Sequence, residues 1–179
     1  TATQPHFQLQ SENLFDGISG YNLAPAFGDV DGDGEVDAII GDSNGYLHYF
    51  TGEGNLQFNN VGLVNNVDLS GNSDPILIDN DADGSLELLV GELNGNVNYY
   101  EYEDGQFNFI HATYLSSLEI LYTSLDHFDI DNDGDSEIII GSWGNGISIF
   151  DSQNGAWSLI DMNIPFTSLR SSPAITDIN

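Results

Sequence analysis

Three acidic segments hold the residues of this chain that are best suited to do chemistry. DVDGDGEVD begins at Asp29, DNDADGSLE at Asp79 and DIDNDGDSE at Asp129, so the segments start 50 residues apart. Each has acids at positions 1, 3, 5 and 9. Carboxylate oxygens at this spacing can converge on one hard cation, with a backbone carbonyl at position 7 as a further ligand, and such an oxygen-only shell suits calcium. The sequence therefore predicts about three calcium ions per chain.

Each predicted site takes four carboxylates and one carbonyl from its own loop. The predicted ligands are Asp29, Asp31, Asp33, Asp37 and the Glu35 carbonyl in the first loop, Asp79, Asp81, Asp83, Glu87 and the Ser85 carbonyl in the second, and Asp129, Asp131, Asp133, Glu137 and the Asp135 carbonyl in the third. A glycine at position 6 of every loop permits the positive φ that folds the chain around an ion. The alternative is a solvated turn, because Asp, Asn and Gly favour turns on their own. Three copies in register favour the metal site.

These loops are not EF-hands. An EF-hand has an acid at position 12, whereas the corresponding residues here are Ile40, Val90 and Ile140. Strand-like runs follow the loops where an EF-hand would begin a helix. The elements that position these loops must therefore be strands.

The sequence around each loop predicts four short antiparallel strands per repeat. Apolar runs AIIG, LLVG and IIIG follow the loops and end at Gly41, Gly91 and Gly141. Asn-Gly pairs come next and predict type I′ hairpins. Alternating β-branched and aromatic residues follow in YLHYF, NVNYY and GISIF, and then in LQFNN, QFNFI and AWSLI. The predicted fold is all-β, built of propeller-type blades, with an open or helical stack of blades as the alternative.

The spacing of the repeats divides the chain. Pro25, Pro75 and Pro173 each lie four residues before an aspartate, so a further repeat starts near the end of the sequence. We expect about three blades and the start of a fourth, and interpret the chain as an excerpt of a longer array. The predicted units are 1–22, an outer strand at Phe7–Leu9 and lead-in; 23–71, 72–121 and 122–170, three repeats; and 171–179, the start of a truncated fourth repeat.

The net charge excludes several classes of partner. The chain has 29 acidic residues and one basic residue, Arg170, giving a formal net charge of −28. Nucleic acid and anionic membrane surfaces are repelled by such a chain. No apolar stretch approaches the roughly 18 residues of a membrane-spanning helix, so we expect no membrane insertion. Bound cations would relieve the self-repulsion of the acids.

The loops and their flanking strands, most clearly FGDVDGDGEVDAIIG from Phe27, resemble FG-GAP or VCBS repeats. Such repeats occur in integrin α-subunit propellers and in many secreted bacterial proteins. The resemblance implies seven-bladed propellers, calcium held in a hairpin loop of the blade, and extracellular roles in adhesion or carbohydrate-linked processes. Only the first copy has the Phe-Gly pair. Seven blades of this period would need about 350 residues, so a closed ring requires further sequence or further copies.

The sequence gives little support for catalysis. The four histidines fall at unrelated repeat positions, and the clustered acids are better explained as metal ligands than as a glycosidase pair. Six aromatic residues could form sugar-stacking platforms, although we expect most of them in the core between blades: Tyr49, Phe50, Tyr99, Tyr100, Trp143 and Trp157.

Three hypotheses of function follow, none of them enzymatic for this chain itself. The first is a calcium-stabilised extracellular module for adhesion or ligand binding, with a glycan or protein as ligand. The second is a structural subunit of an extracellular filament or surface assembly. The third is an ancillary domain of a secreted carbohydrate-active enzyme. The expected partners include further blades of the same longer chain or other copies of it. Calcium loops of this kind suit the calcium concentration outside cells, so we expect an extracellular or cell-surface location.

Overall fold

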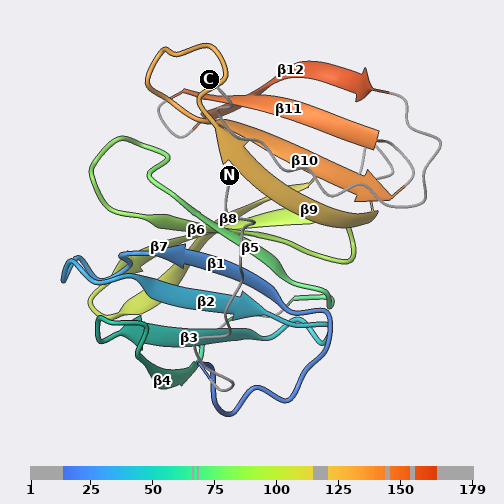
Figure 1. Ribbon diagram of the computed structural model, residues 1–179. Helices are drawn as coiled ribbons and strands as arrows, with labels where there is room; N and C mark the ends of the chain where they lie inside the picture. The colour runs from blue at the N-terminus through green and yellow to red at the C-terminus, as the bar shows by residue number, and fades with distance from the viewer. Residues whose placement is uncertain are drawn as a thin grey trace, which may run out of the picture.

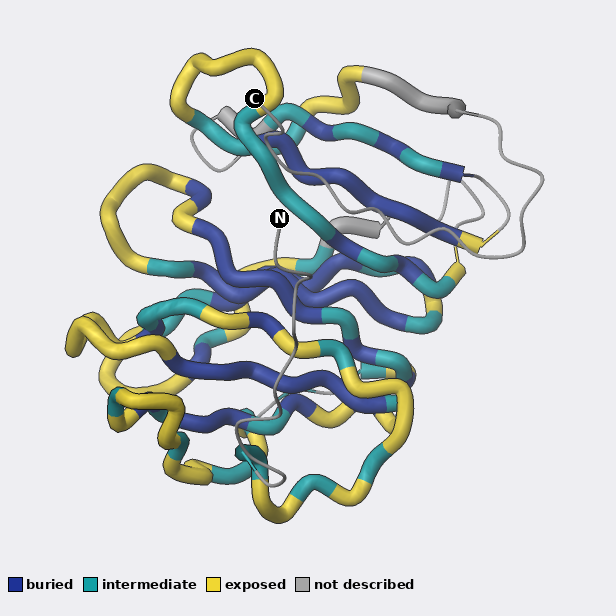
Figure 2. Tube along the Cα trace, viewed as in Figure 1, coloured by how far each residue is buried: buried dark blue, intermediate teal, exposed yellow. Residues whose placement is uncertain are grey.

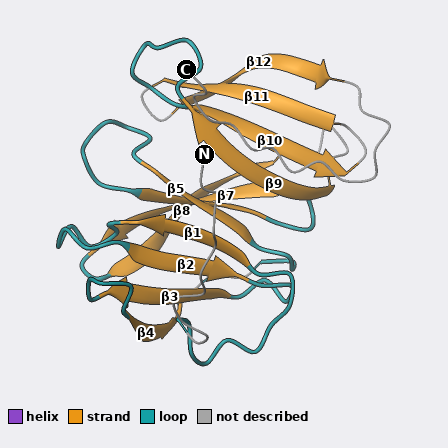
Figure 3. Ribbon diagram, viewed as in Figure 1, coloured by secondary structure: helices purple, strands orange, loops and turns teal. Residues whose placement is uncertain are grey.

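The structure is a computed structural model that describes residues 14–65, 67, 69–114, 121–143, 146–153 and 156–164. These residues form three four-stranded antiparallel sheets (Figures 1 and 3). The all-β prediction, with blade-like sheets of four strands, is confirmed. The expected outer strand at Phe7–Leu9 and the expected start of a fourth repeat at 171–179 lie outside the described residues.

Each sheet is a meander of four consecutive strands. The first sheet contains β1 (Ala24–Gly28), β2 (Asp37–Gly41), β3 (Leu47–Gly52) and β4 (Phe58–Leu63); the second contains β5 (Asp74–Ile78), β6 (Glu87–Gly91), β7 (Asn96–Glu103) and β8 (Gln106–Tyr114); the third contains β9 (Leu121–Phe128), β10 (Glu137–Trp143), β11 (Gly146–Gln153) and β12 (Ala156–Ile164). The acidic loops connect the first and second strands of each sheet. Because these two strands pair along their length, both ends of every acidic loop are fixed.

The second strand of each sheet is the most deeply buried. All five residues of β2 and of β6 are buried, and Figure 2 shows these strands as continuous dark segments. Continuous apolar runs such as AIIG and LLVG form strands whose two faces are both covered. The acidic loops, in contrast, are largely exposed, so each sheet places a solvent-accessible loop on a rigid buried strand.

The Asn-Gly hairpins form, but the predicted type I′ turn is wrong for the two that the structure describes fully. Type I′ requires a positive φ at both central residues, and here only Gly45 and Gly95 have one, at 88° and 86°. The amide of Gly45 donates to the Asp42 carbonyl, and the amide of Asp42 donates to the Tyr46 carbonyl. This is a three-residue loop with a left-handed glycine at its end.

Side chains next to each turn explain the difference. Asp42 Oδ1 accepts the amides of Asn44 and Tyr46 at 2.8 and 3.1 Å, so the acid before the first turn organises it. In the second hairpin, Asn94 Oδ1 accepts the Asn96 amide at 2.9 Å. Such local bonds from side chains to backbone amides compete with the regular hairpin geometry.

The core lies between the sheets. Ile39 and Leu47 of the first sheet pack with Leu88 and Val90 of the second in one apolar cluster. Leu89, Val97 and Tyr99 of the second sheet pack with Ile138, Ile140 and Phe150 of the third in another cluster. Neighbouring sheets also approach along their first strands, β1 beside β5 and β5 beside β9. The second sheet thus uses one face for the first sheet and the other for the third, as blades do.

Most of the aromatic residues expected in the core are there. Tyr49, Phe50, Tyr99 and Tyr100 are between 1% and 6% exposed, so they do not form a surface platform. Trp143 is 42% exposed at the end of β10, where its ring packs on Tyr122. No helix among the described residues is long and apolar enough to cross a membrane.

Candidate metal centres

The three acidic loops occupy equivalent places in the three sheets. They join β1 to β2, β5 to β6 and β9 to β10, and in Figures 1 and 2 they project from the same edge of the stacked sheets. The glycine at position 6 has a positive φ in each loop, at 93° for Gly34, 93° for Gly84 and 105° for Gly134. The predicted role of these glycines in folding the loop is confirmed.

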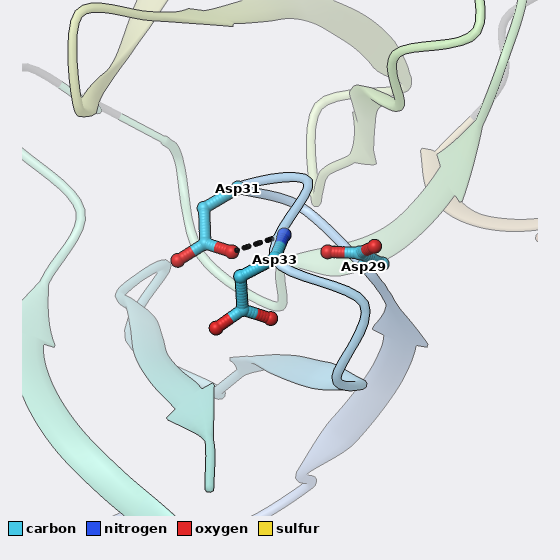
Figure 4. Close-up of side chains that lie close together, drawn as sticks. All are labelled: Asp29, Asp31 and Asp33. Carbon is cyan, nitrogen blue, oxygen red and sulfur yellow. Dashed lines mark hydrogen bonds between the residues drawn. The ribbon is translucent and has the colours of Figure 1, made fainter.

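Backbone amides fold each loop around its carboxylates. In the first loop Asp29 accepts the amides of Gly32 and Gly34 at 2.9 and 3.0 Å. Asp31 accepts the Asp33 amide at 3.2 Å, which Figure 4 shows as a dashed line. The same bond from the position-6 amide to the first aspartate recurs at Asp79 and Asp129. The loop sequence therefore pre-shapes the acidic cluster through its own backbone.

In the first loop the clustered acids are Asp29, Asp31 and Asp33. One carboxylate oxygen of each lies within 4.8 Å of the other two. Figure 4 shows the carboxylates of Asp31 and Asp33 next to each other, with Asp29 beside them. The acid at position 9, Asp37, does not belong to this group.

In the second and third loops the acid at position 9 is a glutamate, and it joins the cluster. The groups within 4.8 Å are Asp79, Asp81 and Glu87 in the second loop and Asp129, Asp131 and Glu137 in the third. Here the acids at position 5, Asp83 and Asp133, stand outside. Like Asp33 in the first loop, they accept the amides of their own position-7 residues, at 2.7 and 3.0 Å.

The acid at position 9 has a second role that the sequence reasoning missed. In every loop it accepts the amide of the position-2 residue, from Val30 to Asp37 at 3.0 Å, from Asn80 to Glu87 and from Ile130 to Glu137 at 2.6 Å each. This acid is buried in all three sheets. Because it is the first residue of the second strand, it ties the loop to the sheet.

Asp37 is held more extensively than its counterparts. Its Oδ1 accepts the Gly52 amide at 2.8 Å, and its Oδ2 lies 3.3 Å from the hydroxyl of Tyr49 in addition to the Val30 amide. Both oxygens are therefore engaged by the protein. The side chain of Asp is one methylene shorter than that of Glu, which keeps the carboxylate of Asp37 among the strands.

The acids in the clusters are electrostatically frustrated without a cation. The pKa of Glu87 is raised to about 7, mainly by burial and in smaller part by the neighbouring Asp81, Asp79 and Asp83, against the lowering effect of the hydrogen bond from Asn80. Burial also raises the pKa of Glu137, with Asp131 and Asp133 contributing. Desolvation raises the pKa of Asp31, and Asp37, Asp33 and Asp29 add to it. A divalent cation would reverse these effects, because it favours the charged carboxylates.

Two observations support calcium as the ion that these clusters would bind. Calcium–oxygen distances are about 2.3 to 2.6 Å, so oxygens within 4.8 Å of one another can share one ion. In the third loop Asp129 Oδ1 is buried without a hydrogen-bond partner among the described residues. A buried carboxylate oxygen without a donor is costly, and a cation at the cluster would satisfy it.

The structure thus brings together some of the predicted ligands and not others. Positions 1 and 3 contribute to the cluster in every loop, position 5 in the first loop only, and position 9 in the second and third only. The carbonyl ligands predicted at Glu35, Ser85 and Asp135 stay predictions.

A further constraint at position 4 was also missed by sequence reasoning. Gly32, Ala82 and Asn132 all have a positive φ, at 76°, 60° and 62°. Glycine and asparagine adopt this conformation readily, whereas alanine does not. The occurrence of Gly and Asn at position 4 in two of the loops is the signal that could have revealed it.

The first and second loops also touch the following sheet. Val30, at position 2 of the first loop, belongs to the same apolar cluster as Phe107 of the second sheet. Asn80, at position 2 of the second loop, accepts a hydrogen bond from Trp157 Nε1 of the third sheet at 3.4 Å. The geometry of one loop is therefore coupled to the packing of the next sheet.

Comparison with known families agrees with this geometry. Residues 79–140, from the second acidic loop to β10, match the FG-GAP-like repeat family. The resemblance to FG-GAP-type repeats is confirmed over this range. No curated protein matches the chain.

Proposed function

We propose that this chain is a calcium-stabilised module of an extracellular repeat protein, and that it serves adhesion or ligand binding rather than catalysis. The observation that carries the proposal is the recurrence of one acidic cluster at the same place in three sheets. The FG-GAP-like repeat at residues 79–140 is of a type found in extracellular proteins, which supports the location.

Calcium would act on the packing of the sheets as well as on the loops. The acids at position 9 connect loop and strand, and the residues at position 2 connect loop and following sheet. An ion that fixes the carboxylates would therefore stiffen two neighbouring sheets together. A rigid surface loses less entropy when it binds a large partner, which suits an adhesion module.

The negative net charge of the chain limits the kinds of ligand that it can bind. With 29 acidic residues against one basic residue, anionic partners are disfavoured unless calcium bridges the two. Neutral glycans and neutral or basic proteins remain as ligand classes.

The experiment is a binding screen against immobilised neutral glycans and extracellular proteins, in millimolar calcium and again after chelation. We expect binding that calcium supports and chelation abolishes. The matched control is the triple variant Asp29→Asn, Asp79→Asn and Asp129→Asn, which loses one cluster acid in every loop. Binding that persists unchanged in chelator and in the triple variant would contradict the proposal.

A structural role in an extracellular assembly is the second candidate. The observation in its favour is that successive sheets use equivalent residues for packing, an arrangement that can continue indefinitely. Electron microscopy of the chain in calcium distinguishes this candidate: it predicts filaments or lattices, and uniform single particles would count against it.

A further inference from the structure

Two aromatic side chains of the third sheet meet at the end of β10 that lies away from the acidic loop. Trp143 is 42% exposed, and its indole ring lies 5.2 Å from the ring of Tyr122, centroid to centroid, at an interplanar angle of 47°. The third acidic loop joins the opposite end of β10, so this pair of rings is separate from the candidate metal centre (Figure 1). We call Tyr122 and Trp143 the aromatic platform.

A β-bulge brings the two rings of the platform together. Gly141 of β10 pairs with Ser124 of β9. Trp143 pairs with Leu121, so four residues of β9 span three residues of β10. Tyr122 lies within this bulge and has a φ of 54°, in the left-handed region. In a regular strand Tyr122 would point to the opposite face from its neighbour Leu121, whereas a bulge re-aims a side chain. The ring contact therefore depends on the irregular backbone.

The backbone conformation of Tyr122 is unfavourable for a tyrosine. The residues 100 and 50 positions earlier are Asn22 and Asn72, and they have similar φ values of 53° and 49°. Asparagine enters the left-handed region readily, whereas a bulky aromatic residue there is an outlier. Strained residues of this kind cluster at ligand-binding and active sites. The third sheet thus holds a strained tyrosine at a position where the other two sheets have asparagine.

Trp143 also departs from the pattern of the repeats. In the first two repeats, two residues separate Gly41 and Gly91 from the Asn-Gly pair that follows. In the third repeat, three residues separate Gly141 from this pair, and Trp143 is one of them. The shorter stretches of the first two repeats hold no aromatic residue. Because the first two sheets form without a tyrosine or a tryptophan at these positions, packing of the sheets does not explain the aromatic platform.

The surroundings of the aromatic platform are uncharged, although the chain has 29 acidic residues. Neither acid nor base occurs in the three described segments around it, which are 93–96, 121–125 and 141–143. The amide of Tyr122 donates to the Leu93 carbonyl at 3.0 Å, which places the exposed Asn94 close to the platform. A cationic ligand would gain from carboxylates beside the rings, and the net charge of the chain repels an anionic one. These surroundings favour a neutral ligand.

We infer that the aromatic platform is a binding site for a neutral oligosaccharide, whose sugar rings stack on Trp143 and Tyr122. A pyranose ring has a flat C–H face that packs on an aromatic ring, and its hydroxyl groups form hydrogen bonds with polar groups such as the side-chain amide of Asn94. Ligand sites commonly combine aromatic surface with a few polar groups in this way. The inference rests on the proposed ligand-binding function, and it names the site and the class of ligand.

The test is isothermal titration calorimetry of the intact chain in calcium, with cellotetraose and chitotetraose as probes. We expect the wild-type chain to bind at least one of them. Trp143→Ala should weaken this binding by about thirtyfold, as is typical of an aromatic hot spot. Tyr122→Asn should also weaken it while retaining Tm, because asparagine holds this position in the other two sheets. Tyr46→Ala is the matched control and should leave binding unchanged, since Tyr46 is 53% exposed in the corresponding hairpin of the first sheet.

A wild-type chain that binds neither tetrasaccharide, or a Trp143→Ala chain that binds as tightly as wild type, would overturn the inference. Binding of tetralysine in place of the tetrasaccharides, abolished by Trp143→Ala, would also overturn it, because the rings would then serve a cation. Native mass spectrometry of the same samples separates this site from the calcium sites, since Trp143→Ala should leave the calcium count unchanged. A chain without calcium that still binds a tetrasaccharide through Trp143 would contradict the proposed calcium sites and support the platform.

Discussion

The first acidic loop differs from the two that follow in which acids form its cluster and in what the acid at position 9 binds. In the first loop, the acid at position 9 is an aspartate whose two oxygens are taken by two backbone amides and a tyrosine hydroxyl, and the cluster is completed by position 5. In the second and third loops a glutamate reaches the cluster while still accepting the position-2 amide. The extra methylene of glutamate therefore allows the buried acid at position 9 to reach the cluster, whereas the shorter aspartate bonds only to the strands and the loop backbone.

Removal of calcium is expected to have the largest effect on stability, because all three loops would lose an ion. Binding at a hundredfold excess over Kd contributes about 2.7 kcal/mol per site, so three sites contribute about 8 kcal/mol. For a chain of this size that corresponds to a fall in Tm of roughly 20 °C on chelation. Differential scanning calorimetry with and without chelator measures it, and an unchanged Tm would contradict a stabilising role for calcium.

Asp37→Asn is expected to destabilise the chain by about 3 kcal/mol even in chelator, because an amide cannot replace a buried carboxylate that accepts two backbone amides. Urea unfolding in chelator measures this directly. Asp31→Asn is the control, since Asp31 is exposed and its loss removes repulsion within the cluster. Equal stabilities for the two variants would erase the distinction between the roles of positions 9 and 3 in the first loop.

Glu87→Gln should behave in the opposite way in chelator. It removes a buried charge whose pKa is raised to about 7, so the calcium-free chain should gain roughly 2 kcal/mol near neutral pH. Because the pKa of Glu87 is higher in the folded chain than in the unfolded chain, ionisation of Glu87 destabilises the fold as pH rises from 4.5 through 7. A neutral glutamine does not ionise, so the variant avoids this loss of stability.

In calcium the same variant should lose one of its ions. Titration calorimetry measures the stoichiometry, and Glu137→Gln in the third loop provides the matched comparison. A Glu87→Gln chain that loses stability in chelator would show that this glutamate, like Asp37, serves mainly the fold.

The acids at position 5 are expected to differ in their effect on calcium affinity, by less than the effects above. Asp33 belongs to its cluster and Asp83 does not, although both accept the amide of their own position-7 residue. Asp33→Asn should weaken calcium binding at the first loop by about tenfold, or 1.4 kcal/mol, and Asp83→Asn should weaken the second loop less. Titration calorimetry on each variant gives the two affinities, and a reversed order would refute the assignment of ligands by cluster.

The sequence was sufficient to predict the strands and the loops, because both depend on local patterns. Apolar runs between a loop and a turn specify β2, β6 and β10, and the glycine at position 6 specifies the bend. The predicted turn type was wrong because side chains bond the backbone of each turn: Asp42 accepts two amides of the first hairpin, and Asn94 accepts the Asn96 amide in the second.

Long-range contacts account for the rest of what the sequence did not show. Asp37 accepts a hydrogen bond from the amide of Gly52, 15 residues away. A glycine is required at position 41 because a Cβ atom there would clash with Ser73 of the next sheet. Neither partner can be recognised from the spacing of one repeat. The different membership of the clusters likewise depends on how far a side chain reaches from its strand.

The smallest effect is expected at position 4 of the loops. Ala82 has a positive φ of 60°, where an L-residue is strained, so Ala82→Gly should stabilise the second loop by up to about 1 kcal/mol. Asn132→Gly, at the same position of the third loop, should gain less because asparagine tolerates this conformation. Thermal unfolding of both variants in calcium compares them, and a destabilising Ala82→Gly would contradict the assignment of strain.

Native mass spectrometry of the intact chain, in calcium and after chelation, tests the central claim most directly because it counts bound ions. We expect three calcium ions per chain, falling to two in Glu87→Gln. A chain that carries no calcium at millimolar concentrations would contradict the proposed metal sites and leave the acidic clusters as solvated turns.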